Sequence, residues 1–196
     1  MVFRARWRPA VPRAGGGPPH AEAPALVRLS CTFGFPRPLP DWVGLGVRID
    51  GGDDHDDLDL LLVSSADVPS PWRQMRPTRE ALRRPFTSVT RYPLGRPGWV
   101  VVATPAAPRS GTLADLSAGA SPCPVTYRLE AAESPGSRRP LGELVLVERV
   151  DGDVPGLRFR PPDDGGAVVA PLRRRVYAWS QKPDRAAPVA PAAAGP

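Results

Sequence analysis

Two runs of sequence decide the fold of this chain: Val43-Gly44-Leu45-Gly46-Val47-Arg48-Ile49 and Leu58-Asp59-Leu60-Leu61-Leu62-Val63-Ser64. In the first run, apolar side chains alternate with Gly and Arg, which is the period of a strand that buries one face. Residues 50–57 between the runs are acidic and contain glycine, a composition typical of a turn. Together the three segments predict an antiparallel β-hairpin.

Shorter runs of the same kind lie on both sides of this hairpin. Before it, residues 2–8 alternate loosely, and Leu26–Cys31 places Val27, Leu29 and Cys31 on one face of a strand. Further strands are expected at 86–92, 98–103, 125–130 and 143–149. About eight short strands separated by turn residues predict a mostly-β (α+β) fold, an antiparallel barrel or sandwich.

Two helical segments are expected beside the strands. Ser70 and Pro71 offer an N-cap and a first-turn proline, which predicts a short helical segment near 71–84, broken at Pro77. Apolar side chains recur at helical spacing late in the chain, and they predict a C-terminal amphipathic helix: Leu172, Val176 and Trp179.

Composition divides the chain into one domain and a tail. The 28 Pro and 19 Gly residues cluster at both ends and between the β-branched runs, as in strand-and-turn proteins. We expect residues 1–181 to form a single domain with a loop at 9–24. Residues 182–196 are rich in Ala and Pro and are expected to be a disordered tail.

The charge balance says little about partners. Basic residues exceed acidic ones by six, and all but Lys182 of the 26 are Arg. An Arg-only set with abundant Ala, Pro and Gly is typical of a GC-rich bacterial genome, so we do not expect a nucleic-acid partner. Apolar stretches such as Leu60–Val63 are too short to span a bilayer, and no secretory signal is seen. Two isolated cysteines, Cys31 and Cys123, fit a cytoplasmic location with reduced thiols.

An ordered series of motifs resembles the heme-dependent catalase superfamily. That family carries a V-R-F-S strand and then D-P-R-G-F-A-V-K-F, where this chain has Val27-Arg28-Leu29-Ser30 and Asp41-Trp42-Val43-Gly44-Leu45-Gly46-Val47-Arg48. The segments Leu157–Pro161 and Arg173–Tyr177 follow in the order that small bacterial members of the family show. The resemblance covers residues 2–181 approximately, and it implies a catalase-like barrel.

The family's catalytic equipment is largely missing. Its distal His lies just ahead of the first barrel strand, so that position falls before Met1 if residues 2–8 are that strand. The two histidines, His20 and His55, match nothing in the family. Ser64 or Ser65 stands where the family has a distal Asn, and Val43 replaces the Arg of D-P-R-G. We therefore expect no normal catalase activity.

The Arg173–Tyr177 spacing is what remains of the family's heme site. In the family, a Tyr phenolate ligates heme iron and an Arg one turn away stabilises the anion, because a Tyr needs a nearby cation to ionise at neutral pH. By this resemblance Tyr177, Arg173 and Arg28 are candidate residues for heme or another small ligand. The alternative is that Tyr177 simply packs under the predicted helix.

Two other functions stay open at the level of sequence. An acidic cluster is followed by Asp59 and consists of Asp53, Asp54, His55, Asp56 and Asp57. It suggests a metal-dependent hydrolase such as a phosphodiesterase, and the alternative is that the cluster is only a solvated turn. A second, basic cluster consists of Arg73, Arg76, Arg79, Arg83 and Arg84. It suggests a basic, non-catalytic interaction module, and the alternative is a solvated face that neutralises the acidic turn. Because the spacing of a calcium loop is absent, no metal site is assigned.

Overall fold

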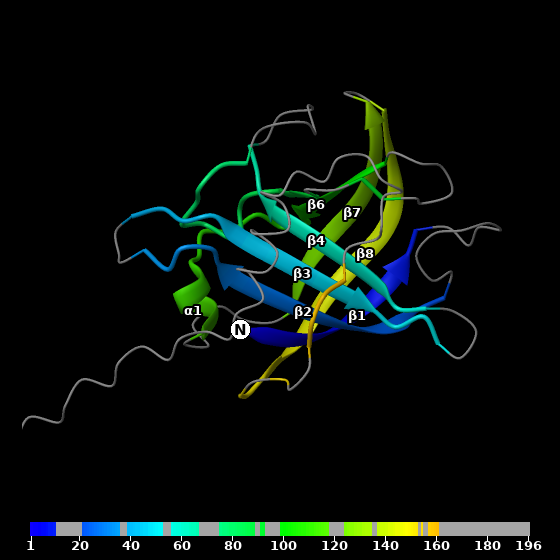
Figure 1. Cartoon of the computed structure of the whole chain (residues 1–196), viewed down its shortest axis with the longest axis horizontal. Helices are drawn as coiled ribbons and strands as arrows, with labels where there is room; N and C mark the ends of the chain where they lie inside the picture. The colour runs from blue at the N-terminus through cyan, green and yellow to red at the C-terminus, as the bar shows by residue number, and fades with distance from the viewer. Residues whose placement is uncertain are drawn as a thin grey trace, which may run out of the picture.

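The computed structural model describes residues 1–10, 21–35, 39–52, 56–66, 75–88, 91–92, 99–117, 124–134, 137–152, 154 and 157–160. These residues form a closed barrel of antiparallel strands, in which each strand pairs with the next along the chain and the last pairs with the first (Figure 1). The strands are β1 (Val2–Pro9), β2 (Ala23–Cys31), β3 (Val43–Ile49), β4 (Leu58–Ser64), β5 (Phe86–Ser88), β6 (Val100–Pro105), β7 (Val125–Ser134) and β8 (Ser137–Val150).

The predicted hairpin is confirmed as β3 and β4. Val47 lies opposite Leu60 and Arg48 lies opposite Asp59, so the register sets apolar against apolar and base against acid. Val47 and Leu60 are buried inside the barrel, whereas Arg48 projects from its outer face. The alternation in the sequence therefore corresponds to the two faces of the sheet.

Several strands differ in length from those predicted. β2 begins at Ala23, so the loop expected at 9–24 is shortened at both ends, while β5 ends at Ser88 and β7 and β8 are longer than expected. Pro140 lies inside β8 opposite Glu130, next to a register shift that accommodates a residue without an N–H donor. Cys31 was expected to face inward with Leu29, but it is exposed because β2 has reached the end of the barrel there.

The prediction of a helical segment near 71–84 is wrong for the described residues of that range, 75–84. The backbone of this part is used for bridges to strand ends. Arg76 N–H donates to the carbonyl of Ser64 at 2.9 Å, and Thr78 exchanges two backbone hydrogen bonds with Asp41 at 2.7 and 3.3 Å. Groups paired in this way are not available for the i to i−4 bonds of a helix.

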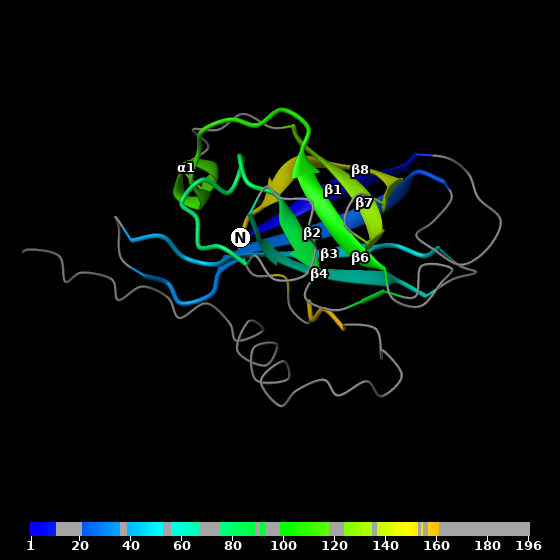
Figure 2. The same cartoon turned by 90° about the horizontal axis from the view of Figure 1, so that it is seen from above.

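One short helix that the sequence reading missed is present. Helix α1 (Leu113–Ser117) begins after Thr112, whose hydroxyl accepts the Asp115 N–H at 3.2 Å while the Asp115 carboxylate accepts the Thr112 N–H at 2.6 Å. This reciprocal arrangement is a capping box with Asp in the place of Glu. The helix lies beside the barrel, near one end of the strands (Figures 1 and 2). The predicted C-terminal helix and tail lie outside the described residues.

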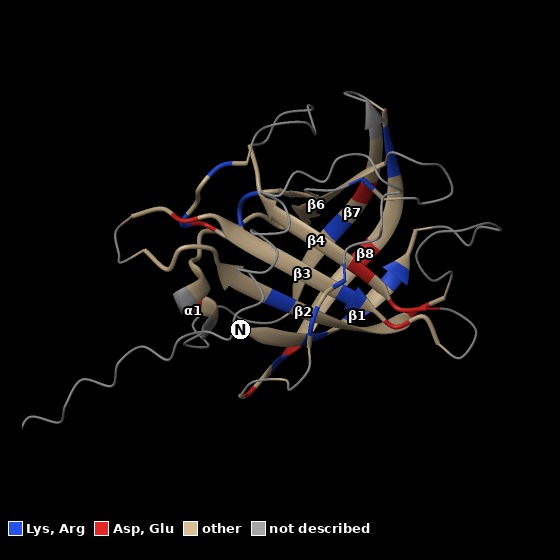
Figure 3. Ribbon diagram, in the orientation of Figure 1, with Lys and Arg blue, Asp and Glu red and all other residues tan. Residues whose placement is uncertain are grey.

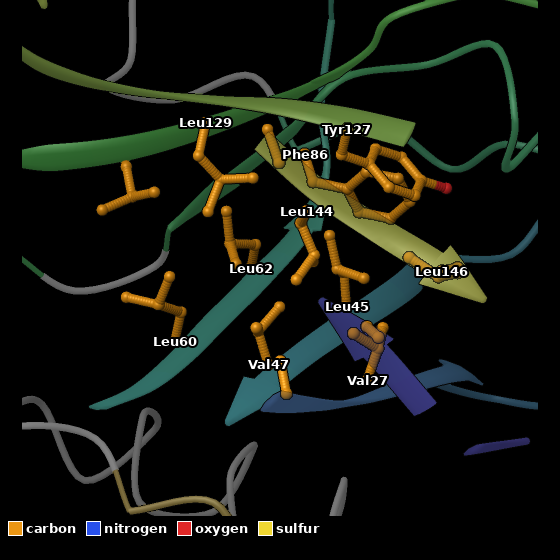
Figure 4. Close-up of a cluster of buried hydrophobic side chains, with 14 of the residues drawn as sticks. Val27, Leu45, Val47, Leu60, Leu62, Phe86, Tyr127, Leu129, Leu144 and Leu146 are labelled. Carbon is orange, nitrogen blue, oxygen red and sulfur yellow. The ribbon is translucent and has the colours of Figure 1, made fainter. Parts of the chain in front are cut away.

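Apolar side chains from every part of the sheet fill the barrel interior. Figure 4 shows aliphatic side chains of β2, β3 and β4 directed toward the Phe86 and Tyr127 rings and the leucines of β7 and β8. Phe86 and Tyr127 contact each other edge to face at 5.8 Å. Most of this core is at most 3% exposed: Val27, Leu45, Val47, Leu60, Leu62, Phe86, Tyr127, Leu129, Leu144 and Leu146.

Gly142 allows β8 to close on β1. A Cβ at this position would clash with the carbonyl oxygen of Arg8 and lie 2.5 Å from Cη2 of Trp7, which is fully buried. We expect Gly142→Ala to lower the free energy of unfolding by about 3 kcal/mol, because a backbone atom cannot give way cheaply. Urea denaturation measures this change.

Gly44→Ala is the matched control on the same sheet. Its Cβ would lie 3.2 Å from the Ser30 hydroxyl, a small group that can rotate aside, so we expect a loss below about 1 kcal/mol. Equal losses in the two variants would contradict the role given to Gly142.

Candidate functional site

Arg28, one of the residues that carry the family resemblance, lies on the outer face of the sheet formed by β2, β3 and β4. The register joins Arg28 to Gly46 and Gly46 to Leu61, so these three form one row across the strands. Arg28 lies between the inward residues Val27 and Leu29, which places its half-buried side chain on the outside of the barrel. The matched Arg therefore belongs to a surface and not to the barrel interior.

Phe159 covers this row at Gly46. Its ring is 4% exposed, and a Cβ on Gly46 would lie only 2.8 Å from the ring atom Cε2. The glycine therefore provides the space in which the ring packs against the sheet. Leu157 N–H donates to the Val154 carbonyl at 3.1 Å just before this contact. We call residues 157–160 the strap.

A buried ion pair holds the strap in place. Arg48 Nε and Nη2 donate to the two carboxylate oxygens of Asp59, each at 2.8 Å, in a bidentate pair. Asp59 also accepts the Arg160 N–H at 2.5 Å, and Arg48 donates to the Arg158 carbonyl. Arg48 lies 5.9 Å from the centre of the Phe159 ring as well. Both charges are thus used to tie the strap to β3 and β4.

The electrostatics of Arg48 reflect this arrangement. The hydrogen bond to Asp59 raises the pKa of Arg48 above its ordinary value, and the negative charges of Asp59 and Asp57 act in the same direction. Burial opposes the shift, since it disfavours the charged form. Arg48 therefore stays charged at every pH at which the protein is studied.

The positions matched to the family's catalytic residues serve the barrel itself. The Ser64 hydroxyl is fully buried, accepts the Val43 N–H at 3.1 Å and donates to the Arg76 carbonyl at 2.8 Å. Ser65 contacts the Pro85 carbonyl and the Thr87 hydroxyl through its own hydroxyl. These hydroxyls hold neighbouring segments together and are not directed at an open pocket.

Asp41, matched to the Asp of the family motif, has a structural role too. Its carboxylate is 5% exposed and accepts the backbone N–H groups of Phe33, Gly34 and Phe35 at 2.7 to 3.4 Å. Gly34 has a φ of 67°, which a residue without a side chain adopts readily. The carboxylate therefore shapes the turn after β2. The Phe33 ring packs on Trp42 at 5.5 Å beside it.

The remaining sequence candidates are only partly placed. Arg173 and Tyr177 lie outside the described residues, as do Asp53, Asp54, His55, His20 and Arg73. Asp57 and Asp59 from the acidic cluster both pair with Arg48, at 3.7 and 2.8 Å. Within the described ranges, no group of three or more His, Cys, Asp or Glu side chains is positioned to hold a metal ion.

The basic cluster does not form a helical face in its described part. Arg76 belongs to the segment that bridges to the end of β4, and Arg83 pairs with Glu80 at 3.6 Å within a turn. Arg48 on the adjacent strand pairs with Asp57 at the end of the acidic turn and with Asp59 on β4. The sequence reading did not predict these ion pairs, because Arg48 precedes the turn in the chain whereas Asp57 and Asp59 come at its end and after it.

Tyr127 is a buried residue that the sequence reading did not single out. Its hydroxyl has no hydrogen-bond partner in the described part of the chain, and burial raises the pKa of the phenol above its ordinary value. A neutral phenol deep in the barrel is a poor ligand for iron, because ligation requires the phenolate. The only available signal was its place in the strand alternation of 125–130.

Heme, the cofactor that the resemblance implies, does not fit the residues described. The interior is filled by hydrocarbon side chains, and the surface beside Arg28 is covered at Gly46 by Phe159. A porphyrin needs a flat apolar slot with a ligand for the iron. The described residues supply neither at these two places.

A groove of about 730 Å³ lies elsewhere on the outer face of the barrel. It is lined by β1, the first half of β2, the end of β3 with its following turn, and β8. Figure 3 shows basic residues on β1 and at the end of β3 beside the acidic turn that joins β3 to β4.

No helix in the described ranges is long and apolar enough to cross a membrane.

Comparison with known proteins gives no relatives: no family model, no curated protein and no solved structure matches the chain. The resemblance to the catalase superfamily is therefore carried by the sequence motifs alone.

We expect Asp59→Asn to lower the free energy of unfolding by about 2–3 kcal/mol, since Arg48 would lose its charged partner in a largely buried place. Asp57→Asn is the matched control: its side chain is half exposed and 3.7 Å from Arg48, so the loss should stay below about 1 kcal/mol. Chemical denaturation of both variants checks this. A larger loss for Asp57→Asn would show that the ion pair with Asp59 does not hold the strap.

Proposed function

We propose that this chain is a catalase-like barrel protein that has lost peroxide chemistry and binds a small ligand. One observation carries the loss: the Ser64 hydroxyl, at one of the two positions matched to the family's Asn, is buried, and backbone groups use its donor hydrogen and one of its acceptor lone pairs. A hydroxyl committed in this way is not free to polarise a bound peroxide. Val43, at the Arg position, is buried and has no polar group to contribute.

The closed antiparallel barrel supports the fold part of this proposal. Eight strands follow one another around the barrel in chain order, and the matched residues Arg28, Asp41 and Gly44 lie on or between β2 and β3. Barrels of this kind are a frequent scaffold for binding sites built from their outer and loop residues. The barrel alone does not select a family or a ligand.

Heme is the first ligand to test, because the resemblance assigns Tyr177 as its axial ligand. The described residues do not form a heme site in the barrel interior or beside Arg28, so the proposed site residues are Arg173 and Tyr177, outside the described ranges. Ligated heme would supply an iron centre, while the protein's part would be a phenolate oxygen held near a cation.

We expect hemin titration to give a saturable Soret shift that disappears in Tyr177→Phe. Tyr127→Phe is the matched control: its hydroxyl has no partner among the described residues, so its removal should leave both the fold and the titration unchanged. Absorbance spectroscopy at micromolar hemin measures the shift. No spectral change, or a change that Tyr177→Phe retains, would exclude Tyr177 as a heme ligand.

Peroxide turnover tests the catalytic part separately. We expect the protein, with or without hemin, to decompose hydrogen peroxide no faster than free hemin at the same concentration. Oxygen evolution measures the rate. Turnover well above that of free hemin, lost in Tyr177→Phe, would contradict the proposed loss of activity.

A further inference from the structure

The outer groove borders the strap site and shares Arg48 with it, but Arg28, Arg173 and Tyr177 are not among its described lining residues. Its volume of about 730 Å³ is within the range of small-molecule sites in proteins. The groove lies across four neighbouring strands in the order β8, β1, β2 and β3, with β1 and β3 on either side of β2. The side chains on these strands decide what it can hold.

One row of neighbouring residues across the groove has a positive charge at one end and a negative charge at the other. Arg6 on β1 is the register partner of Pro24 on β2, and the Asp50 N–H at the end of β3 donates to the Pro24 carbonyl at 3.0 Å. The row therefore runs from a cation through an apolar ring to an anion. Both end residues are exposed, and neither forms an ion pair within the described part of the chain. Asp50 Oδ1 accepts the Gly52 N–H at 2.8 Å, so a ligand would share this carboxylate with the turn.

The neighbouring row has its charges already matched. Arg4 pairs with Leu26, and Leu26 pairs with Arg48 across the strands. Arg48 is bound to Asp59, and Arg4 lies 3.5 Å from Glu148. Leu26 thus extends the apolar floor of the groove. Arg6 and Asp50 are the charged residues of the first row that can attract opposite charges on a ligand.

The spacing of the strands sets the size of that ligand. Adjacent strands lie about 4.8 Å apart, so β1 and β3 are separated by about 10 Å across β2. An extended peptide of three residues spans about 10 Å between its ends. Its carboxylate suits the two-pronged donor of Arg6, and its ammonium group suits the Asp50 carboxylate.

We propose that the groove binds short unblocked peptides, or zwitterions of equal length, with the carboxylate at Arg6, the ammonium group at Asp50 and the middle over Pro24 and Leu26. This proposal does not rest on heme binding or on Tyr177. Binding is expected to weaken with added salt, because both end contacts are exposed ion pairs.

Titration calorimetry with trialanine tests the site on the full chain. We expect saturable binding that weakens at least about tenfold in Arg6→Gln and in Asp50→Asn, a factor that corresponds to about 1.4 kcal/mol. The control variant Arg128→Gln removes an exposed Arg of β7 that lies outside the groove, and it should leave binding unchanged. N-acetyl-trialanine amide, which lacks both end charges, should not bind measurably.

Three results would overturn the proposal. They are no saturable binding of trialanine up to about 10 mM, equal binding of the blocked peptide, and equal weakening in Arg128→Gln. Because Arg6 and Asp50 are exposed, circular dichroism and unfolding midpoints of their variants should match the parent chain. The hemin titration does not enter this test, so either proposal can fail while the other stands.

Discussion

Closure of the sheet by β1 against β8 is the constraint on which the rest of the molecule depends. These strands lie at opposite ends of the described chain, yet Arg4 lies opposite Glu148 and Trp7 opposite Leu144. Closure removes both edges of the sheet, so that every strand has two partners. It also creates a single interior, in which the Trp7 ring packs over Gly142. The outer surfaces that bind the strap and form the groove take their shape from this closure.

The buried polar groups have structural roles that require no catalysis. Asp41, Asp59 and Ser64 are buried, and each has its hydrogen bonds satisfied by segments of the barrel or by the strap. Removing such a group costs stability whether or not it catalyses anything. Conserving them would therefore preserve a family-like pattern of residues. The matched residues are accordingly stronger support for a shared architecture than for a shared reaction.

Sequence reasoning succeeded where a local pattern determines the structure. The alternation in Val43–Ile49 and Leu58–Ser64 predicted the hairpin, and weaker alternation located the other strands to within a few residues. It failed where a contact with a residue far away in the sequence determines the local structure. The helix near 71–84 was wrong because Arg76 and Thr78 pair with strand ends, which no local signal announces. Likewise, nothing near Asp59 in sequence indicates that Arg160 would bind it, so the acidic cluster suggested a metal or a solvated turn.

Native-state hydrogen exchange tests the closed barrel most directly. Closure predicts that the backbone amides of β1 that bond to β8 and those of β8 exchange slowly and together with β3, as one cooperative unit. Fast exchange of the β1 or β8 amides beside a protected β3–β4 hairpin would contradict it, because those strands would then be open edges of an unclosed sheet.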